Sequence, residues 1–415
     1  MNVSSDYDCL VIGAGPAGCT AAALVAEHGH KTLLVEREAV PRFHVGESLM
    51  PETYWTLKRL GVLDAMKQSA CVKKFSVQFV NQTGRESQPF YFHERDPHES
   101  SQTWQVRRSE FDELLYKNAA AKGADCRDRT RVTDIHFDGD RITGVQLRGA
   151  EGDPADVACR VLVDATGFQS LLGTRLGLRK PHPRLRNASI WTYYEGAKRA
   201  PGRDEGATVI LHTSDRKAWF WYIPLHDDIV SVGVVGESDY LLRGRQDPAT
   251  IFAEELAKCP ATAQRVEAAR RVDDFHVVRD FSYTSKEAAG PGWVLIGDAY
   301  TFLDPVYSSG VFLALKSGEL AADCIHDAFV HDDVSAARLG SWSPSFDEGV
   351  SLIAQLVHAF YTDGFSFGAF IREHPEHAGR LTDLLVGKVF NNDVAPIFAD
   401  MNPWIERIAA APSDA

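Results

Sequence analysis

Three glycines and one acid near the amino terminus have the types and spacing that bind a phosphate-bearing ligand. Gly13, Gly15 and Gly18 form the pattern G-x-G-x-x-G, and Glu36 follows about twenty residues later. Gly13 permits a tight turn, Gly15 lets the backbone approach a diphosphate, and Gly18 lets a helix pack on a strand. The Glu36 carboxylate is spaced to accept hydrogen bonds from ribose hydroxyls. The four residues predict a dinucleotide-binding turn.

The elements around this turn complete a βαβ unit. Residues 7–36 read as an apolar strand, the glycine turn, an alanine-rich helix that stops at Gly29, and a second apolar strand that ends at Glu36. The first turn of such a helix offers free N–H groups and the positive end of the helix dipole, and both favour a diphosphate. The glycine pattern is informative because strand, helix and acid stand in register with it.

A strand of the middle chain is unusually aromatic. Residues 217–225 read KAWFWYIPL, and period-two alternation places Trp219 and Trp221 on one face. The same alternation places Phe220 and Tyr222 on the other face. Both faces are apolar, as in a strand buried between two layers, so packing is the simplest role. Rigid indoles can also wall a site against water.

Two later segments favour FAD over NAD as the dinucleotide. The stretches VLVDATGFQS (161–170) and GWVLIGDAYTFLDP (292–305) are apolar strands that lead into an acid and a glycine. Together with the glycine turn they resemble the FAD-binding fold of aromatic hydroxylases of the p-hydroxybenzoate hydroxylase type. The resemblance implies that Asp298 contacts the ribityl chain of the flavin.

Two further stretches resemble flavin-contacting segments of that fold. WQVRRSEFDELLYKNA resembles a helix opening whose arginine reaches the cofactor, with Arg108 as the better-placed match and Arg107 as the alternative. PRFHVGESLMP resembles the segment after the second strand, with Arg42, Glu47 and Ser48 as candidates, although polar side chains there could equally cap a helix. The residues assigned to FAD in this way are Gly13, Gly15, Ala17, Gly18, Glu36, Arg37, Arg42, Ser48, Arg108, Asp298, Pro305 and Gly310.

Three motifs narrow the class of flavoprotein. The aromatic strand spells W-x-W-x-I-P, and residues 302–310 spell F-x-x-P-x-x-S-x-G. Both motifs resemble signatures of the flavin-dependent halogenases. CVKKFSVQF lies where those enzymes carry an active-site lysine; Lys74 matches the spacing better than Lys73, and Ser76 stands where many relatives have glycine. The resemblance covers most of the chain.

The resemblance implies a reaction that uses FAD as FADH2, oxygen, and chloride or bromide. Hypohalous acid forms at the flavin in that family and reaches the substrate some distance away. The implied catalytic residues are Lys74, Trp219, Trp221 and Ser308. Backbone N–H groups at Ser309 and Gly310 are the expected halide site. An apolar channel would favour the neutral amine of Lys74, which could attack hypohalite or donate a hydrogen bond to it; both roles stay open.

The substrate prediction rests on one departure from the family pattern. Tyr307 occupies the position where halogenases of free tryptophan carry glutamate, so we expect a phenolic or pyrrolic ring, as a small molecule or tethered to a carrier protein. Relatives that act on such rings also carry the GES of residues 46–48. Three alternatives share the fold: an aromatic monooxygenase that hydroxylates its substrate, a reductase of isoprenoid double bonds, and a flavin-binding protein without turnover. The monooxygenase has no need of W-x-W-x-I-P, the reductase would need a long apolar pocket, and the departures at Ser76 and Tyr307 leave the flavin-binding protein open.

Composition limits the partners. The chain has 415 residues and a formal net charge of −13, which disfavours nucleic acid and anionic membrane surfaces. No apolar run approaches the roughly 18 residues of a membrane span, and the amino terminus has no basic leader, so we expect a cytoplasmic protein. The single G-x-G-x-x-G favours reduced flavin from a separate NAD(P)H-dependent flavin reductase. The cysteines form no C-x-x-C, which indicates buried thiols and no metal site.

The predicted fold class is α/β. A Rossmann-like FAD-binding domain with a parallel sheet is interleaved with a substrate-side β-sheet domain, and a helical segment follows. The predicted spans are 1–75, 101–180 and 285–330 for the FAD-binding domain, 76–100 and 181–284 for the β-sheet domain, and 331–415 for the helical region.

Overall fold

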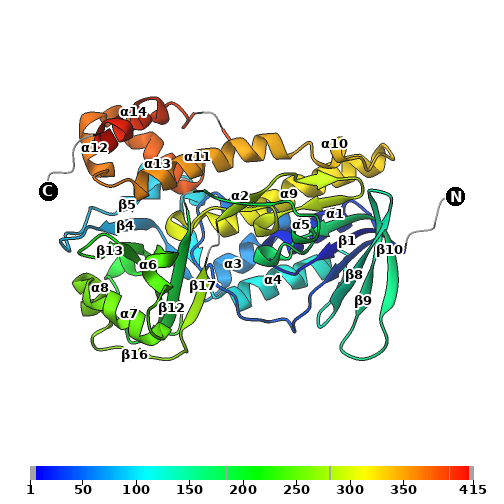
Figure 1. The fold of residues 1–415 in the computed structure, drawn as a ribbon, viewed down its shortest axis with the longest axis horizontal. Coiled ribbons are helices and arrows are strands. Elements are labelled where there is room, and N and C mark those ends of the chain that lie inside the picture. Colours follow the sequence, from blue (N-terminus) through cyan, green and yellow to red (C-terminus); the bar gives the residue numbers. More distant parts are fainter. Residues whose placement is uncertain (1–5, 184, 280–281, 392, 411–415) are drawn as a thin grey trace.

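The computed structural model describes residues 6–183, 185–279, 282–391 and 393–410, and it has the mixed α/β architecture that the sequence predicts. Two large sheets lie side by side, and the carboxy-terminal helices cover one flank of the molecule (Figure 1). The division into three regions stays a prediction, and residues 1–5 and 411–415 of the predicted spans lie outside the described residues.

The first sheet is the predicted dinucleotide-binding sheet. Strand β1 (Tyr7–Ile12) pairs in parallel with β2 (Thr32–Val35) and with β10 (Ala155–Asp164). The outer parallel neighbours are β20 (Trp293–Leu295) and β7 (Asp125–Arg127). Residues 9–12 of β1, 33–35 of β2 and 161–163 of β10 are apolar and buried, because both faces of this sheet are covered there. Further strands at its edges are β8 (Arg131–Asp138), β9 (Arg141–Arg148) and β19 (Ala289–Gly290).

Three long helices pack against this sheet and against each other. Helix α1 (Pro16–Glu27) leaves the glycine turn and is buried along most of its length by α9 (Ser309–Val330) and α4 (Arg108–Ala121). The alanines of α1 and Gly318 of α9 allow this close approach, since a Cβ at Gly318 would lie 2.5 Å from the carbonyl oxygen of Ala17. The amino termini of all three helices therefore gather near the carboxyl edge of β1.

The second sheet contains the aromatic strand. Its order is β16-β12-β15-β14-β13-β4-β5, and β17 also pairs with β12. Strand β14 (Ala218–Pro224) lies between its two antiparallel neighbours and is buried at every residue. The bounds of the other strands are β4 (Ser76–Val80), β5 (Phe90–Tyr91), β12 (Asn187–Glu195), β13 (Thr208–His212), β15 (Ile229–Glu237), β16 (Arg270–Arg271) and β17 (His276–Arg279).

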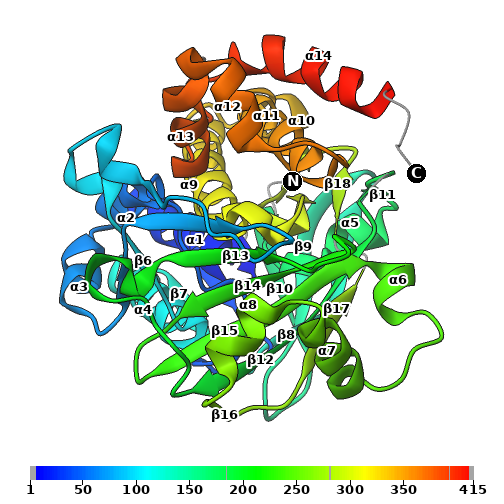
Figure 2. The same ribbon diagram turned by 90° about the vertical axis from the view of Figure 1, so that its left-hand side faces the viewer.

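The two faces of β14 belong to different cores, as the alternation predicts. Trp219 and Trp221 join the large core that includes the dinucleotide-binding sheet. Phe220 and Tyr222 join a separate core under α6 (Ser238–Leu242), α7 (Pro248–Ala257) and α8 (Pro260–Val266). The tryptophan face of the sheet therefore packs in the core shared with the dinucleotide-binding sheet. Figure 2 shows the neighbouring strands β13, β14, β15 and β12 of the aromatic sheet.

Five helices form the carboxy-terminal region, which the sequence predicts as helical from about residue 331. They are α10 (Ala336–Leu339), α11 (Ser343–Tyr361), α12 (Phe367–Glu373), α13 (Ala378–Val386) and α14 (Ile397–Ala410). The aromatic stretch 352–371 is split, because α11 ends at Tyr361 and α12 begins at Phe367. In the described residues, no helix is both long enough and apolar enough to cross a membrane.

Shorter elements connect these layers. They are α2 (Thr53–Leu60), α3 (Leu63–Gln68), α5 (Leu171–Arg175), β3 (Val72–Lys74), β6 (Thr103–Gln105), β11 (Arg179–Pro181), β18 (Tyr283–Ser285), β21 (Thr301–Phe302) and the 3-10 turns η1 (Phe92–Glu94), η2 (Glu99–Ser101), η3 (Gly167–Gln169), η4 (Gly202–Gly206), η5 (Gly297–Ala299), η6 (Pro305–Tyr307) and η7 (Pro375–His377). The cysteines are free, but Cys71, Cys126 and Cys324 are only partly buried, which corrects the prediction that all are buried.

Substitution of Gly18 tests the packing of α1 on its strand. A Cβ there would lie 1.9 Å from the carbonyl oxygen of Gly13, which is backbone and cannot move aside. We expect Gly18→Ala to lower the free energy of unfolding by about 3 kcal/mol in urea titrations of the full chain. Gly15→Ala is the control, because its Cβ would meet only the Arg42 guanidinium at 3.8 Å. Equal unfolding midpoints for wild type and Gly18→Ala would contradict this packing.

Candidate active site

A cavity of about 340 Å³ opens above the glycine turn. It is bounded by the turn, by the loop after β2, by the start of α4 and by the start of α9. The predicted cofactor residues that line it are Gly13, Gly15, Ala17, Glu36, Arg37, Arg42, Arg108, Asp298 and Gly310. A side chain at Gly15 would project toward this space, so the glycine leaves the backbone open to a diphosphate.

An ion-pair network fixes the polar side of the cavity. Glu36 accepts a hydrogen bond from the backbone N–H of Ala14 at 3.0 Å and pairs with Arg42 at 3.1 Å. Arg42 also contacts Asp112 at 2.8 Å, and Asp112 holds Arg108 at 2.9 Å. Burial acts to raise the pKa of Asp112, but Arg108 and Arg42 outweigh it and keep the pKa below its ordinary value. The two arginines are therefore oriented before any ligand arrives.

Asp298 and Arg108 face the cavity from opposite elements. Asp298 lies in η5, after β20, and burial raises its pKa to about 6, with Arg108 acting in the other direction. Arg107, the alternative arginine, does not line this cavity and instead pairs with Asp227 at 3.3 Å. The geometry thus favours Arg108 for a cofactor contact. Acid, arginines and open backbone make a donor set that fits the ribose, ribityl and diphosphate groups of FAD.

The segment before α9 approaches the same cavity. Ser308 has a left-handed backbone with φ of 59°, which turns the chain from η6 into α9. Gly310 lines the cavity, and a Cβ there would lie 3.3 Å from the Phe302 ring. Ser309 is buried in the first turn of α9. Gly18 and Pro305 do not line the cavity; Gly18 serves helix packing, and Pro305 opens η6.

Lys74 lies buried at the end of β3, in the two-stranded sheet that β3 forms with β6. Only 4% of its surface is exposed, whereas Lys73 on the opposite face of β3 is exposed. The Nζ of Lys74 is hydrogen-bonded to Ser48 Oγ at 2.9 Å and donates to the Leu49 carbonyl oxygen at 3.2 Å. Burial lowers the pKa of Lys74 to about 7. Ser48, predicted as a flavin contact, lies beside this amine and does not line the cavity.

The two tryptophans of β14 are held in fixed orientations. The Trp221 indole donates to Ser231 Oγ at 3.1 Å and lies flat over Gly233, where a Cβ would come within 2.2 Å of the ring. The Trp219 indole donates to the Tyr361 hydroxyl at 2.9 Å. The ring centroids are 6.5 Å apart. A paired indole N–H in each case, and the glycine beneath Trp221, restrict the orientations that these large side chains can adopt.

Glu47 is a buried acid that directly precedes Ser48, the residue in contact with Lys74. Glu47 is 3% exposed and accepts a hydrogen bond from the Tyr193 hydroxyl at 2.5 Å. Burial raises the pKa of Glu47 to about 7. Gly46, the preceding residue, lines the dinucleotide cavity. The loop 46–48 therefore connects the cavity to both Glu47 and Lys74.

A second cavity of about 210 Å³ lies where α11 meets the edge of the aromatic sheet. Trp219, Phe360 and Tyr361 line it, together with Asn187. The Tyr361 hydroxyl donates to buried Asp304 at 3.0 Å, and burial raises the pKa of that acid to about 6. The aromatics of α11 thus reach the tryptophan face of β14.

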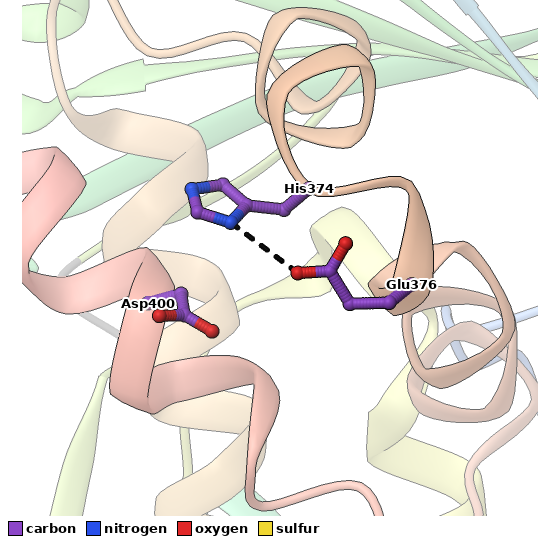
Figure 3. A group of neighbouring side chains, drawn as sticks. All are labelled: His374, Glu376 and Asp400. Atoms are coloured by element: carbon purple, nitrogen blue, oxygen red, sulfur yellow. Dashed lines mark ion pairs between the residues drawn. The ribbon is translucent and has the colours of Figure 1, made fainter.

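A cluster of possible metal ligands lies far from these cavities, in the carboxy-terminal helices (Figure 3). His374, Glu376 and Asp400 offer ligand atoms within 4.8 Å of one another. The His374 Nδ1 is 3.5 Å from Glu376, and Asp400 contacts His377 at 2.8 Å. These ion pairs tie η7 to α14 and account for the grouping. Glu376 and Asp400 are exposed, so the cluster by itself gives no argument for a metal.

Sequence reasoning missed several residues around these sites, among them Asp112, Gln105 and Thr208. The i,i+4 spacing of Arg108 and Asp112 on a helix was a usable signal for the acid. Gln105 and Thr208 had no signal, because each meets its partner only through tertiary packing. Tyr361 lies in a stretch that is rich in Phe and Tyr, but its contact with Trp219 also depends on tertiary packing. Tyr307 is buried and donates to the Leu356 carbonyl oxygen at 3.2 Å, so it packs under α11.

Comparison with known proteins agrees with this geometry. The FAD binding domain family matches residues 6–318. The 1H-pyrrole-2-carbonyl-[peptidyl-carrier protein] chlorinase of Pseudomonas fluorescens is 30% identical, with 99% of this chain and 94% of that protein covered. A tryptophan 2-halogenase of Chondromyces crocatus is 33% identical, with 87% of this chain and 69% of that protein covered.

A solved structure extends the likeness to the whole fold. The flavin-dependent brominase Bmp2 superposes with a TM-score of 0.87 at 28% identity, over 97% of this chain and 98% of that one. The family match ends at residue 318, but the structural likeness continues through the carboxy-terminal helices. FAD and a halide are therefore its cofactors, and this chain belongs to the flavin-dependent halogenases.

Proposed function

We propose that this halogenase places chlorine or bromine on an electron-rich pyrrolic or phenolic ring that is joined to a carrier protein. The observation that carries the proposal is the match in length and sequence to a chlorinase of a carrier-bound pyrrole. The overall reaction replaces one ring hydrogen with halogen and releases water from hypohalous acid. Tyr307 supports a substrate other than free tryptophan, because it fills the position of the expected glutamate with a buried aromatic ring.

We propose that the residues lining the larger cavity hold FAD. The turn at Gly13 and Gly15 would take the diphosphate, Glu36 the ribose, and Asp298 the ribityl chain. Bound in its reduced form, FAD supplies the oxidising chemistry that turns halide and oxygen into hypohalous acid. Chloride or bromide would lie at the first turn of α9, at Ser309 and Gly310, where N–H groups and the helix dipole favour an anion.

Lys74 is proposed to deliver the halogen. Its amine is buried, it has no carboxylate bonded to it, and it lies where the loop 46–48 meets the aromatic sheet. A neutral amine can accept halogen from hypohalous acid with release of water, and an ammonium can donate a hydrogen bond to the acid. Trp219 and Trp221 are proposed to keep water and substrate away from the flavin side.

Reduced flavin is proposed to come from a separate NAD(P)H-dependent reductase in the cytoplasm. The support is the single G-x-G-x-x-G of the sequence, whose turn is part of the larger cavity. Diffusible reduced flavin needs no fixed complex between the two proteins.

The substrate class is tested by turnover with defined acceptors. Purified protein receives FAD, a flavin reductase, NADH, oxygen and bromide, together with a pyrrolyl or hydroxybenzoyl carrier protein, the free acids, or tryptophan. We expect a bromine-containing product on the carrier-bound ring and little on tryptophan, measured by mass spectrometry. Bromination only of tryptophan would overturn the substrate proposal. Hydroxylated product without a carbon–halogen bond would favour the monooxygenase alternative.

Substitution of Lys74 tests the delivery step. Lys74→Met should reduce halogenation of the true substrate by about a thousandfold, since it removes the group that takes up the halogen. FAD affinity should be unchanged, because Lys74 does not line the larger cavity. Lys73→Met is the matched control, as its side chain is exposed on the other face of the same strand. Wild-type rates for Lys74→Met, or loss of activity only in Lys73→Met, would show that the wrong lysine has been chosen.

Substitution of Trp221 tests whether the indoles separate the substrate from the flavin side. Trp221→Ala should open a path for hypohalous acid, so halogen would shift from the true substrate to a free phenol added to the solution. Trp221→Phe should still direct most of the halogen to the true substrate, since a ring still covers Gly233. Phe220→Leu, on the opposite face, is the control. An equal shift of halogen to the free phenol in the Phe and Ala variants would argue against steric exclusion.

A further inference from the structure

A chain of polar side chains leads from Lys74 into the core. Ser48 Oγ, which contacts the Lys74 amine, is 2.8 Å from Thr208 Oγ1. Thr208 Oγ1 accepts a hydrogen bond from Gln105 Nε2, also at 2.8 Å. All four side chains are buried, and Gln105 is 0% exposed. Gln105 lies in the stretch 104–119, whose arginines resemble a cofactor contact, but no motif assigns a role to Gln105 or to Thr208.

Backbone pairing brings these residues together. Strand β6, which ends at Gln105, pairs with β3, which ends at Lys74. The loop 47–49 lies along the other edge of β6, with Ser48 opposite Gln105. Thr208 begins β13 in the aromatic sheet. The chain of contacts therefore joins the two-stranded sheet of β3 and β6 to the aromatic sheet.

The orientation of the Gln105 amide is set by its second contact. Its Nε2 donates to the Gly206 carbonyl oxygen at 2.9 Å, and a carbonyl oxygen can only accept. The amide nitrogen must therefore point this way, which makes Gln105 a donor to Thr208. The Oε1 of Gln105 is buried without a partner among the described residues, so the amide has no competing contact that would turn it round.

This fixed donor gives the chain a direction. With a neutral Lys74, Gln105 donates to Thr208, Thr208 can donate to Ser48, and Ser48 can donate to the amine, so each hydroxyl has one donor and one acceptor. With an ammonium at Lys74, the ammonium donates to Ser48, and only one donor is then needed between Ser48 and Thr208. The proton of the other hydroxyl has no acceptor in the chain. The arrangement favours the neutral amine.

The charged groups around this junction do not reverse that preference. On η4, which packs against β3, Asp204 is bonded by Ser76 at 3.2 Å and by Tyr91 at 2.8 Å. Arg203 of the same turn lies over the Phe75 ring. Glu47, next to Ser48, is bonded by Tyr193, and Lys73 faces solvent. Burial is the sole resolved cause of the shift at Lys74.

We propose that Gln105 is a positioning residue that acts through Thr208 and Ser48 to hold Lys74 as a neutral amine. The inference rests on the proposed role of Lys74 in halogen delivery and adds the requirement that the amine be ready to accept halogen. Gln105 acts by always donating a hydrogen bond to Thr208 and never accepting one from it. A glutamine that only filled space would not set the protonation of a lysine two side chains away.

The test is the titration of Lys74 in the full chain, followed by NMR of ¹³Cε-labelled lysine and assigned with Lys74→Arg. We expect a wild-type midpoint near 7. Gln105→Met keeps the volume but removes the donor, so the midpoint should rise by about one pH unit. Thr208→Val removes both the donor and the acceptor for Ser48, and its midpoint should not rise. If Gln105→Met fails to fold, Gln105→Glu reverses the polarity and should also raise the midpoint.

Gln78→Leu is the matched control. Its amide donates to the Ser87 carbonyl oxygen at 3.0 Å, outside the chain, so the Lys74 midpoint should stay at the wild-type value. An unchanged midpoint in the folded Gln105 variant, or an equal rise in Thr208→Val, would overturn the proposal. The titration involves no turnover, so it tests only the hydrogen-bond chain from Gln105 to Lys74. The role of Lys74 in halogen delivery is tested separately by the activity of Lys74→Met.

Discussion

The structure depends on one strand that is apolar on both faces. Strand β14 is buried at every residue, and its alternation assigns the tryptophans to the core shared with the dinucleotide-binding sheet and Phe220 and Tyr222 to a second core. Burying large aromatic side chains on both faces contributes a few kcal/mol each and leaves no room for register slippage, since a shift by one residue would exchange the two sets. The position of the tryptophan face relative to the flavin cavity follows from this constraint.

The second constraint is electrostatic. Lys74, Glu47, Asp298 and Asp304 are buried ionisable groups whose pKa values move toward neutrality, because burial disfavours their charged forms. By contrast, the acids and arginines beside the glycine turn pair with each other, and the two arginines keep the pKa of Asp112 below its ordinary value. Under the proposed function, the paired acids and arginines provide charge where an anionic cofactor would bind, and Lys74 and Glu47 provide groups that burial favours as neutral beside the path of the oxidant. Such a distribution of perturbed groups is typical of active sites.

Sequence reasoning recovered the fold class and most of the cavity because those features depend on local patterns. The glycine spacing, the strand before it and the acid after the second strand all lie within residues 7–36, so one βαβ unit determines them. Ser48 was assigned to the flavin because its neighbours resemble a flavin-contacting loop, and its side chain in fact turns to Lys74. A loop of three residues can face two sites at once, and alternation along the loop decides which residue faces which site.

The sequence by itself determined the dinucleotide turn, the two-faced aromatic strand and the family motifs, since each is written in residues a few positions apart. The tertiary structure alone decided which lysine is buried, which arginine reaches the cavity, and that Gln105, Thr208 and Tyr361 join the site. The physical reason is that burial and hydrogen-bond partners are properties of packed elements. Lys73 and Lys74 are chemically identical in the sequence, and only the pairing of β3 with β6 places one amine in water and the other in the core.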